Sequence, residues 1–199
     1  MRTADPQKEE QTRAEIITAA QKILQTYGLE KTTMDDIANA VGKGKSTLYY
    51  YYKSKEDVFY AVAQKEMADI EQLLQIELAK CKTSSERLKA MMITRHNGVK
   101  SKMVIYSVLI NETRRFIELF GRIQREGYKM ELESLKAILL DGIRSGEFKR
   151  IKEDECESLA QLGMLLWRGM AANILVSGQL PPESMKVDTA ADIFIRGLK

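Results

Sequence analysis

The sequence predicts an all-α protein of about nine helices, with a small N-terminal three-helix module ahead of a larger helical domain. Prolines stand only at positions 6, 181 and 182, so the long interval between them lacks the strongest helix breaker. Apolar residues in this interval recur every three or four positions, and strand-like alternation is nearly absent. The 199 residues, 44% hydrophobic and 30% charged, are enough to bury a sizeable core.

The first helix is expected from about Pro6 or Lys8 to Tyr27. From Ile16 onward its apolar residues repeat at helical spacing and make one continuous face. Gly28 follows at the position where a left-handed residue commonly ends a helix. A helix of this length is suited to brace shorter helices that follow it.

Two short helices separated by a glycine turn are expected next. Thr33 and Asp36 have the spacing of a capping box, which starts the second helix, and Gly42 stops it. The third helix is expected over Lys45–Tyr52, with Gly44 as its N-cap. Two short helices joined in this way and braced by a preceding helix describe a helix-turn-helix.

The rest of the chain is expected to form long helices. Ser54 and Asp57 give another capping signal, which opens a helix to about Lys80. Composition alone also allows a strand at 103–110, although it would have no partner strand, and Gly127 marks a possible break. The later helices are expected at about 83–99, 103–110, 113–145, 153–177 and 183–198.

The third helix has the pattern of a DNA-reading element. Leu48, Tyr51 and Tyr52 fall at helical spacing and are expected to face the core. The outer face then carries donors and aromatic rings suited to phosphates and base edges. An alternative is that the tyrosine run is ordinary core with an amphipathic rim. A basic patch between positions 37 and 55 favours DNA, and its members are Lys43, Lys45, Lys53 and Lys55.

From Thr12 to about Met67 the chain resembles the DNA-binding module of TetR-type transcriptional regulators. We therefore divide the chain into a DNA-binding domain at residues 1–53 and an effector-binding and dimerisation domain at residues 54–199. The resemblance rests on Ile16-Ile17 with Ala19-Ala20, Gly28, Thr32-Thr33, Ile37-Ala38, Gly42, Thr47-Leu48-Tyr49 and Lys53-Ser54-Lys55-Glu56.

The resemblance implies a set of DNA contacts. Backbone contacts are implied for Thr33, Thr47, Tyr49 and Lys55, and the variable readers would be Lys45, Ser46 and Tyr50. The chain departs from the family pattern at Lys43-Gly44, where an apolar residue and serine are usual, at Ser46, where glycine is usual, and at Tyr52, where phenylalanine is usual. Lys43 is expected to swing outward and add a phosphate contact. These departures make the operator sequence unpredictable.

A lone helix-turn-helix reads too few bases, so a homodimer on a palindromic double-stranded DNA operator is expected. The last two helices carry apolar stripes, and the resemblance implies that they form a four-helix interface with those of a second copy. The alternative is that these stripes are intramolecular core. The expected interface residues are Leu159, Leu162, Gly163, Leu166, Met170, Ile174, Ile193 and Phe194.

The helices between about Ser84 and Ser145, with part of the next, are expected to enclose a pocket for an unidentified small-molecule effector. Methionines in this region suit an adaptable apolar lining, although core filling is the more usual role for them. The candidate polar groups are His96, Tyr106, Asn111, Tyr128 and Trp167, each of which also has an ordinary core or surface interpretation.

Other classes of protein have little support. The single histidine and the separated Cys81 and Cys156 give no metal-ligand spacing, so we expect no metal site, no cofactor and two reduced thiols. No catalytic motif or phosphate-binding glycine loop is present, and an enzyme remains a remote alternative. The longest apolar stretch, Met103–Ile110, is far shorter than the ~20 residues that a membrane helix requires. The N-terminus is polar, and we expect a cytoplasmic protein.

The function predicted from the sequence is a sequence-specific transcriptional regulator, a repressor that a small-molecule effector releases from its operator. The alternative on the same fold is an architectural or cell-organisation protein that binds DNA without such an effector. The sequence hardly separates these two possibilities. The net charge of +3 does not by itself identify a nucleic-acid binder, and the position of the basic patch matters more than the total charge.

Overall fold

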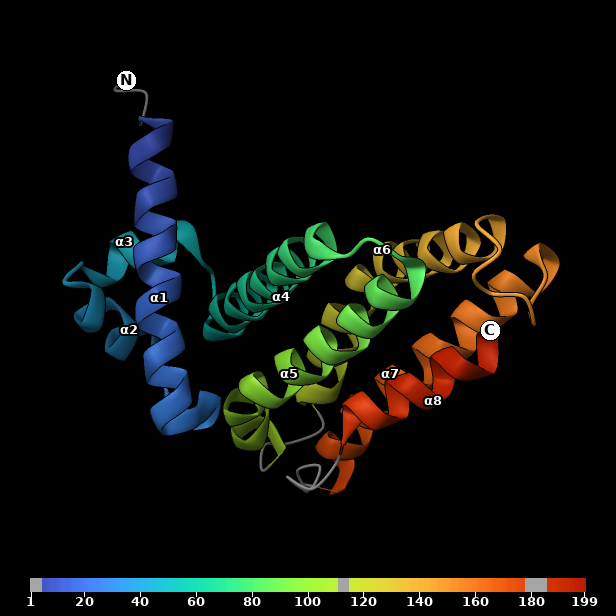
Figure 1. The fold of residues 1–199 in the computed structure, drawn as a ribbon. Coiled ribbons are helices and arrows are strands. Elements are labelled where there is room, and N and C mark those ends of the chain that lie inside the picture. Colours follow the sequence, from blue (N-terminus) through green and yellow to red (C-terminus); the bar gives the residue numbers. More distant parts are fainter. Residues whose placement is uncertain (1–4, 111–114, 178–185) are drawn as a thin grey trace. The chain divides into compact units, whose positions relative to one another are not determined.

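The computed structural model describes residues 5–110, 115–177 and 186–199, and every element in these ranges is helical (Figure 1). Side chains are described outside 99–120, 123–124, 170–172 and 174–185. The all-α prediction is confirmed. The helices are α1 Pro6–Lys31, α2 Met34–Val41, α3 Lys45–Tyr51, α4 Lys55–Lys80, α5 Ser84–Ile110, α6 Arg115–Arg144, α7 Cys156–Ser177 and α8 Val187–Leu198, with a 3₁₀ turn η1 at Glu153–Glu155.

The chain divides into two compact units. The N-terminal unit contains residues 1–66 with 104–123, and the C-terminal unit contains residues 67–103 with 124–199. This division falls inside α4, whereas the sequence places the boundary at residue 53, between α3 and α4. Helix α4 therefore contributes residues to both units.

Local capping signals place several helix ends as predicted. Gly28 leaves the helical region with φ of 79°, so the first helix bends there and continues for one more turn to Lys31. Thr33 and Asp36 form the expected capping box of α2, and Gly42 closes that helix in the left-handed conformation. At the start of α4, Ser54 Oγ accepts a hydrogen bond from the Asp57 amide at 3.1 Å.

Two glycines inside long helices are sites of close packing, and one of them, Gly127, is the possible break that the sequence suggests. The expected separate helices at 83–99 and 103–110 are one helix, α5, and α6 continues through Gly127. A Cβ added at Gly98 would lie 2.9 Å from Ile70 Cδ1, and one at Gly127 would lie 2.9 Å from Met67 Cε. Both glycines therefore allow a side chain of α4 to approach closely, and neither ends its helix.

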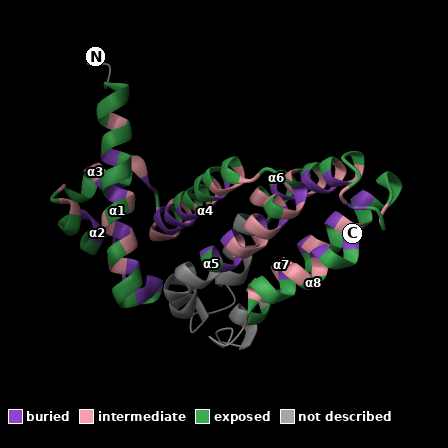
Figure 2. Ribbon diagram, in the orientation of Figure 1, coloured by how far each residue is buried: buried purple, intermediate pink, exposed green. Residues whose placement is uncertain are grey.

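Each unit has its own apolar core, which follows the buried sides of the helices (Figure 2). The N-terminal core includes Ile16, Ala20, Leu24, Leu29, Ile37, Leu48, Val58 and Val62. The C-terminal core includes Leu74, Leu88, Met91, Leu132, Leu139, Phe148, Cys156, Ala160, Met164, Ile195 and Leu198.

None of the described helices combines the length and apolar character needed to cross a membrane.

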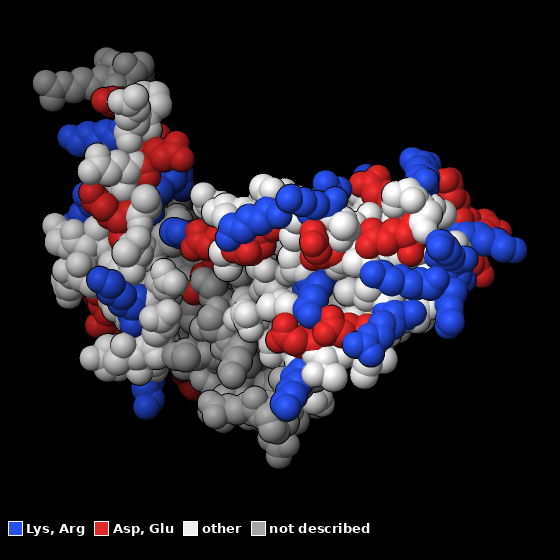
Figure 3. Space-filling model, viewed as in Figure 1, with Lys and Arg blue, Asp and Glu red and all other residues white. Residues whose placement is uncertain are grey.

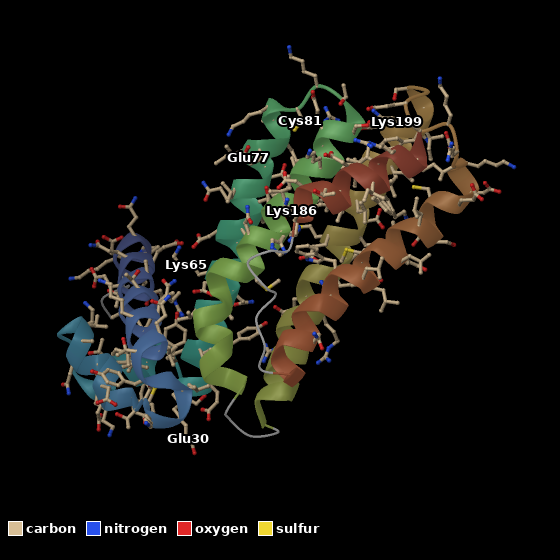
Figure 4. The ribbon with its side chains drawn as sticks, turned by 60° about the horizontal axis from the view of Figure 1, so that its bottom comes forward. Glu30, Lys65, Glu77, Cys81, Lys186 and Lys199 are labelled. Carbon is tan, nitrogen blue, oxygen red and sulfur yellow. The ribbon has the colours of Figure 1, made fainter. Side chains whose placement is uncertain are left out.

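Helix α8 closes the C-terminal unit against α5 and the segment after α6. Lys89 on α5 pairs with Asp192 on α8 at 2.7 Å, and the Arg150 amide donates to the Leu198 carbonyl at 3.1 Å. In Figure 4, Lys186 and Lys199 mark the two ends of this helix. The helix begins at Val187, later than the position 183 that the sequence suggests, and residues 178–185 lie outside the described ranges.

A tight turn after α6 holds Phe148 and Glu147 in place. The Gly142 carbonyl accepts hydrogen bonds from the Glu147 and Phe148 amides, each at 2.9 Å, and Gly146 adopts a φ of 73°. The Phe148 ring is almost fully buried and covers Gly142. The Glu147 carboxylate accepts hydrogen bonds from the amides of Ser84 at 2.8 Å and Ser85 at 3.1 Å, and so caps the first turn of α5.

We expect Gly142→Ala to lower the free energy of unfolding by about 1–3 kcal/mol, since the added methyl group overpacks the contact between Gly142 and the Phe148 ring. Its Cβ would lie 2.2 Å from Phe148 Cδ2, and the turn fixes that ring. Urea unfolding followed by circular dichroism measures the change. Gly197→Ala is the matched control, because a Cβ there meets no atom within 4 Å. Equal unfolding midpoints for Gly142→Ala and wild type would contradict this account of the turn.

We expect Glu147→Gln to reduce stability at pH 7 by about 1 kcal/mol, because the charged cap of α5 is lost. Burial acts to raise the Glu147 pKa, but the hydrogen bonds from Ser85 and Ser84 outweigh it and hold the pKa below its ordinary value of 4.5. The carboxylate therefore stabilises the fold fully above the unfolded pKa and loses this effect as pH falls through the folded pKa.

Urea unfolding at a series of pH values, at one protein concentration, tests this pH dependence. The difference between Glu147→Gln and wild type should be constant near neutrality and shrink below about pH 4.5. Glu133→Gln is the control, because the Glu133 carboxylate is mostly exposed and meets Lys136 only at 3.5 Å. A difference that does not vary with pH would show that the Glu147 charge has no capping role.

Candidate nucleic-acid interface and ligand cavity

The segment from α2 to α3 forms a capped helix-turn-helix. Gly42, with φ of 68°, turns the chain out of α2, and its amide donates to the Ala38 and Asn39 carbonyls. Gly44 is the N-cap of α3, as the sequence predicts, and its carbonyl accepts from Thr47 at 3.0 Å and Leu48 at 3.2 Å. Every hydrogen bond here is local, so the sequence determines the geometry of the turn.

The burial pattern of α3 confirms the predicted phase of this helix. Leu48 and Tyr52 are buried and Tyr51 is half-buried. By contrast, Tyr49 is 39% exposed and Tyr50 is 63% exposed. The Arg13 guanidinium of α1 lies 5.1 Å from the Tyr51 ring centroid and 5.8 Å from that of Tyr52. Burial raises the Tyr52 pKa, and Arg13 partly opposes this effect. The outer face of α3 is therefore open to a partner.

Acidic side chains of the same unit pair with the predicted DNA-contacting residues Lys45, Tyr50 and Lys43. Lys45 Nζ lies 2.9 Å from Asp35 Oδ2, and this hydrogen bond raises the Lys45 pKa. Tyr50 Oη donates to Glu9 Oε1 at 2.9 Å, which raises the Tyr50 pKa. The third pair is Lys43 with Glu15 at 3.2 Å, so Lys43 lies against α1 in this state. Contact with phosphate would exchange these partners.

Backbone carbonyls of the N-terminal unit already bind the Lys55 ammonium, which is one of the predicted phosphate contacts. Its ammonium donates to the carbonyls of Leu29 at 2.7 Å, Glu30 at 3.0 Å and Thr32 at 3.1 Å. An ammonium has three protons, so these three acceptors satisfy it completely. Lys55 thus ties the start of α4 to the end of α1, and a phosphate contact would require at least one of these bonds to break.

The other expected DNA contacts lie on or beside the same two helices. Ser46 is exposed and Thr47 is half-buried in the first turn of α3. The Thr33 hydroxyl already donates to Asp36 Oδ2 at 2.6 Å within the capping box of α2. On the face that Figure 3 presents, acidic and basic side chains are interleaved over the helices.

The C-terminal unit contains an apolar cavity of about 230 Å³ between α5, α6, α7 and α8. Two of the candidate polar residues, His96 and Trp167, line it. Tyr128 is absent from the lining, and Tyr106 and Asn111 lie outside the residues whose side chains are described. The apolar lining includes Leu88, Met91, Met92, Leu135, Leu139, Met164 and Phe194.

A buried ionic cluster adjoins this cavity, and two of its members, Arg95 and Glu131, line it. The Arg95 guanidinium lies 2.7 Å from Glu131 and 2.7 Å from Glu71, and only 10% of the Arg95 side chain is exposed. Arg168 binds the other oxygen of Glu131 at 3.0 Å, and its guanidinium lies 4.9 Å from the Tyr128 ring centroid. Tyr128 therefore supports the cluster from outside the cavity.

Sequence reasoning missed this cluster, although a signal for it exists. Each charged residue occupies a position on an otherwise apolar stripe: Arg95 follows Leu88 and Met91 at helical spacing. Glu131 precedes Leu135 and Leu139 by one and two turns in the same way. A charge within an apolar stripe indicates either a buried ion pair or a ligand-binding group.

The residues expected at a dimer interface separate into two groups. Leu162, Leu166 and Ile193 are 56%, 73% and 66% exposed, and Leu165 beside them is 68% exposed. Met170 and Ile174 lie outside the described side chains. Leu159, Gly163, Leu166 and Phe194, which are also expected at the interface, line the cavity. Leu166 therefore belongs both to the exposed group and to the cavity-lining group.

Both cysteines are free thiols in the C-terminal unit. Cys156 is buried and Cys81 is half-buried, and burial raises the pKa of each. Figure 4 shows Cys81 just past the end of α4. A raised thiol pKa disfavours the reactive thiolate.

Comparison with known proteins gives consistent results. Residues 16–62 match the family model of bacterial regulatory proteins, tetR family. A fatty acid metabolism regulator protein of Bacillus subtilis (strain 168) is 27% identical over 139 residues, which are 68% of this chain and 70% of that protein.

Two solved structures are similar over nearly the whole chain. A transcriptional regulator from Cytophaga hutchinsonii ATCC 33406 is 27% identical with a TM-score of 0.66, over 91% of this chain and 95% of its own. The fatty acid degradation regulator FadR from Bacillus halodurans has a TM-score of 0.65 at 18% identity, over 99% of this chain and 96% of its own, and shows the same fold.

We expect Asp35→Asn to raise the affinity for duplex DNA about two- to fivefold, because it removes the competing partner of Lys45 and a negative charge near phosphate. Fluorescence anisotropy with a labelled duplex at several salt concentrations measures the effect. Lys45→Ala should lower the affinity and, if Lys45 contacts phosphate, reduce the salt slope by about 1. Asp141→Asn makes the same chemical change at a surface pair of the C-terminal unit and should change nothing. Unchanged affinity in Asp35→Asn would mean that Lys45 does not reach DNA.

Proposed function

We propose that this chain, a member of the TetR family of bacterial regulatory proteins, is a homodimeric repressor whose operator affinity falls when an apolar small molecule fills the cavity of the C-terminal unit. The observation that carries the proposal is the capped α2–α3 element with its open outer face. The match of residues 16–62 to the family model supports it. A DNA-binding regulator acts where the chromosome lies, so we place it in the cytoplasm.

In this proposal, α3 enters the major groove with its N-terminal residues nearest the base edges. Lys45, Ser46 and Tyr50 would read bases, and the remaining contacts would fix the register on the phosphates. The first set is the more exposed, which supports this division. The phosphate contacts would come from Thr33, Lys43, Thr47, Tyr49 and Lys55.

We propose that α7 and α8 form the interface with a second copy. Leu162, Leu165 and Leu166 lie within about one turn of α7, and each is more than half exposed, which supports this assignment. Large apolar side chains gathered on one surface commonly mark an interaction site. A two-fold dimer would present two copies of α3 to two half-sites of a palindrome.

We propose that the effector belongs to the fatty acyl class. The cavity wall is almost entirely apolar, which suits an aliphatic chain. The B. subtilis relative, a fatty acid metabolism regulator protein, matches this chain over 70% of its own length. Filling the cavity would shift the population toward a conformation with a different spacing of the two DNA-reading helices.

Selection of binding sites from random duplex DNA tests the proposal. The wild-type protein should enrich a palindrome and bind it far more tightly than random DNA at the same salt concentration. Leu162→Glu should elute as a monomer and lose the palindrome, because a charge enters the interface. Ile76→Glu, at an exposed apolar position on α4, is the matched control and should behave as wild type. Weak, sequence-independent binding by the wild type would sink the repressor and favour an architectural DNA-binding protein.

A further inference from the structure

Arg95 is an unusual group to place on the wall of an apolar cavity. Burying a guanidinium is costly unless its charge is paired, and the side chain is 90% buried here. Its Nη2 donates to Glu71 and its Nη1 to Glu131, both at 2.7 Å. Its Nε, also buried, meets no hydrogen-bond acceptor among the described residues. The pairing therefore leaves donor capacity in a side chain that borders the cavity.

The two carboxylates that hold Arg95 are not equivalent. Glu131 is bound by both Arg95 and Arg168, and its side chain is 9% exposed. Glu71 is bound by Arg95 and by the Gln75 side-chain amide at 2.8 Å, and its side chain is 19% exposed. Glu131 also lines the cavity, whereas Glu71 belongs to α4 and is not part of the lining. Glu71 is therefore the partner of Arg95 that water replaces most easily.

We propose that Arg95 binds the carboxylate of a free fatty acid in the cavity, and that this carboxylate replaces Glu71 as the second partner of Arg95. The inference rests on the proposed function, since it names the head group of a ligand assigned there to the fatty acyl class. Planar bidentate recognition of carboxylates is the chemistry for which a guanidinium is best suited. The alkyl chain would lie along the methionines and leucines of the lining.

Exchange of one carboxylate for another keeps the buried charge constant. Among the residues that the structure describes, the cluster holds two guanidiniums and two carboxylates, so a third buried carboxylate would be unbalanced there. When the ligand carboxylate arrives, the Glu71 side chain moves into water, where its charge is well solvated. A neutral head group offers Arg95 no such exchange, so the cavity should prefer the acid to the alcohol.

The exchange removes a tie between α5 and α4. Helix α4 runs without interruption from Lys55 to Lys80 and starts directly after the DNA-reading segment. Next to Glu71, Ile70 packs closely on Gly98 of α5, so the two helices are in direct contact at this point. Release of Glu71 by the ligand would favour an α4 arrangement that binds the operator less well.

A ligand series tests the head group. Dodecanoate, 1-dodecanol and dodecanoyl-CoA share one chain, and Trp167, the single tryptophan of the sequence, reports binding by its fluorescence because it lines the cavity. With the full-length protein at neutral pH, we expect dodecanoate to bind about 10- to 100-fold more tightly than dodecanol. Operator release measured by anisotropy should follow the same order.

Two variants and one control complete the test. Arg95→Gln should abolish the preference for the acid while dodecanol still binds, which also shows that the cavity is intact. Glu71→Gln weakens the competing partner and should tighten dodecanoate binding and release the operator at lower ligand concentration. Arg87→Gln changes an arginine of the same helix that pairs with Asp141 outside the cavity, and should behave as wild type. If Arg95→Gln does not fold, Glu71→Gln still decides the question.

The outcomes separate the two proposals. Three results would overturn the role of Arg95 but leave the acyl cavity standing. The first is equal binding of the acid and the alcohol, and the second is tighter binding of the CoA thioester with no effect of Glu71→Gln. The third is a preference for the acid that persists in Arg95→Gln. Failure of all three ligands to bind, with operator binding intact, would overturn the acyl cavity and the role of Arg95 together.

Discussion

A guanidinium buried beside an apolar cavity has to be paired, and the arrangement of the C-terminal unit satisfies this constraint. Arg95 brings together a carboxylate of α4 and one of α6, and α7 supplies a second guanidinium to Glu131. One ionic cluster thus joins four helices around the space that a ligand would occupy. Such a cluster contributes little net stability, because desolvation offsets most of the attraction, but it makes the helix arrangement specific and sensitive to a competing charge.

Pairs of opposite charge also occur on the DNA-reading element, but these pairs lie at the surface, whereas the Arg95 cluster is buried. Lys45, Lys43 and Tyr50 each meet a carboxylate of their own unit, but these contacts are exposed and individually weak. In the proposed complex, a phosphate would displace them at small cost. Lys55 differs, because three backbone carbonyls satisfy its ammonium and make it a structural link between α1 and α4.

The proposed ligand site and the proposed dimer surface share α7. One side of this helix lines the cavity through Gly163 and Met164, and another presents Leu162 and Leu165 to solvent. Leu166 lines the cavity and is exposed. A ligand that displaces α7 would therefore change the surface offered to a second copy, which gives the effector a route to the half-site spacing in addition to the α4 route.

The sequence by itself determined the features that depend on neighbours three or four residues away. The capping box at Thr33, the left-handed turn at Gly42 and the phase of α3 around Leu48 were predicted and found, because their hydrogen bonds and periodicity are local. Only the tertiary structure decided that Gly98 permits close packing inside one helix and that Arg95 pairs with carboxylates of two other helices. Both depend on which helices lie side by side, and residues distant in the sequence control that arrangement.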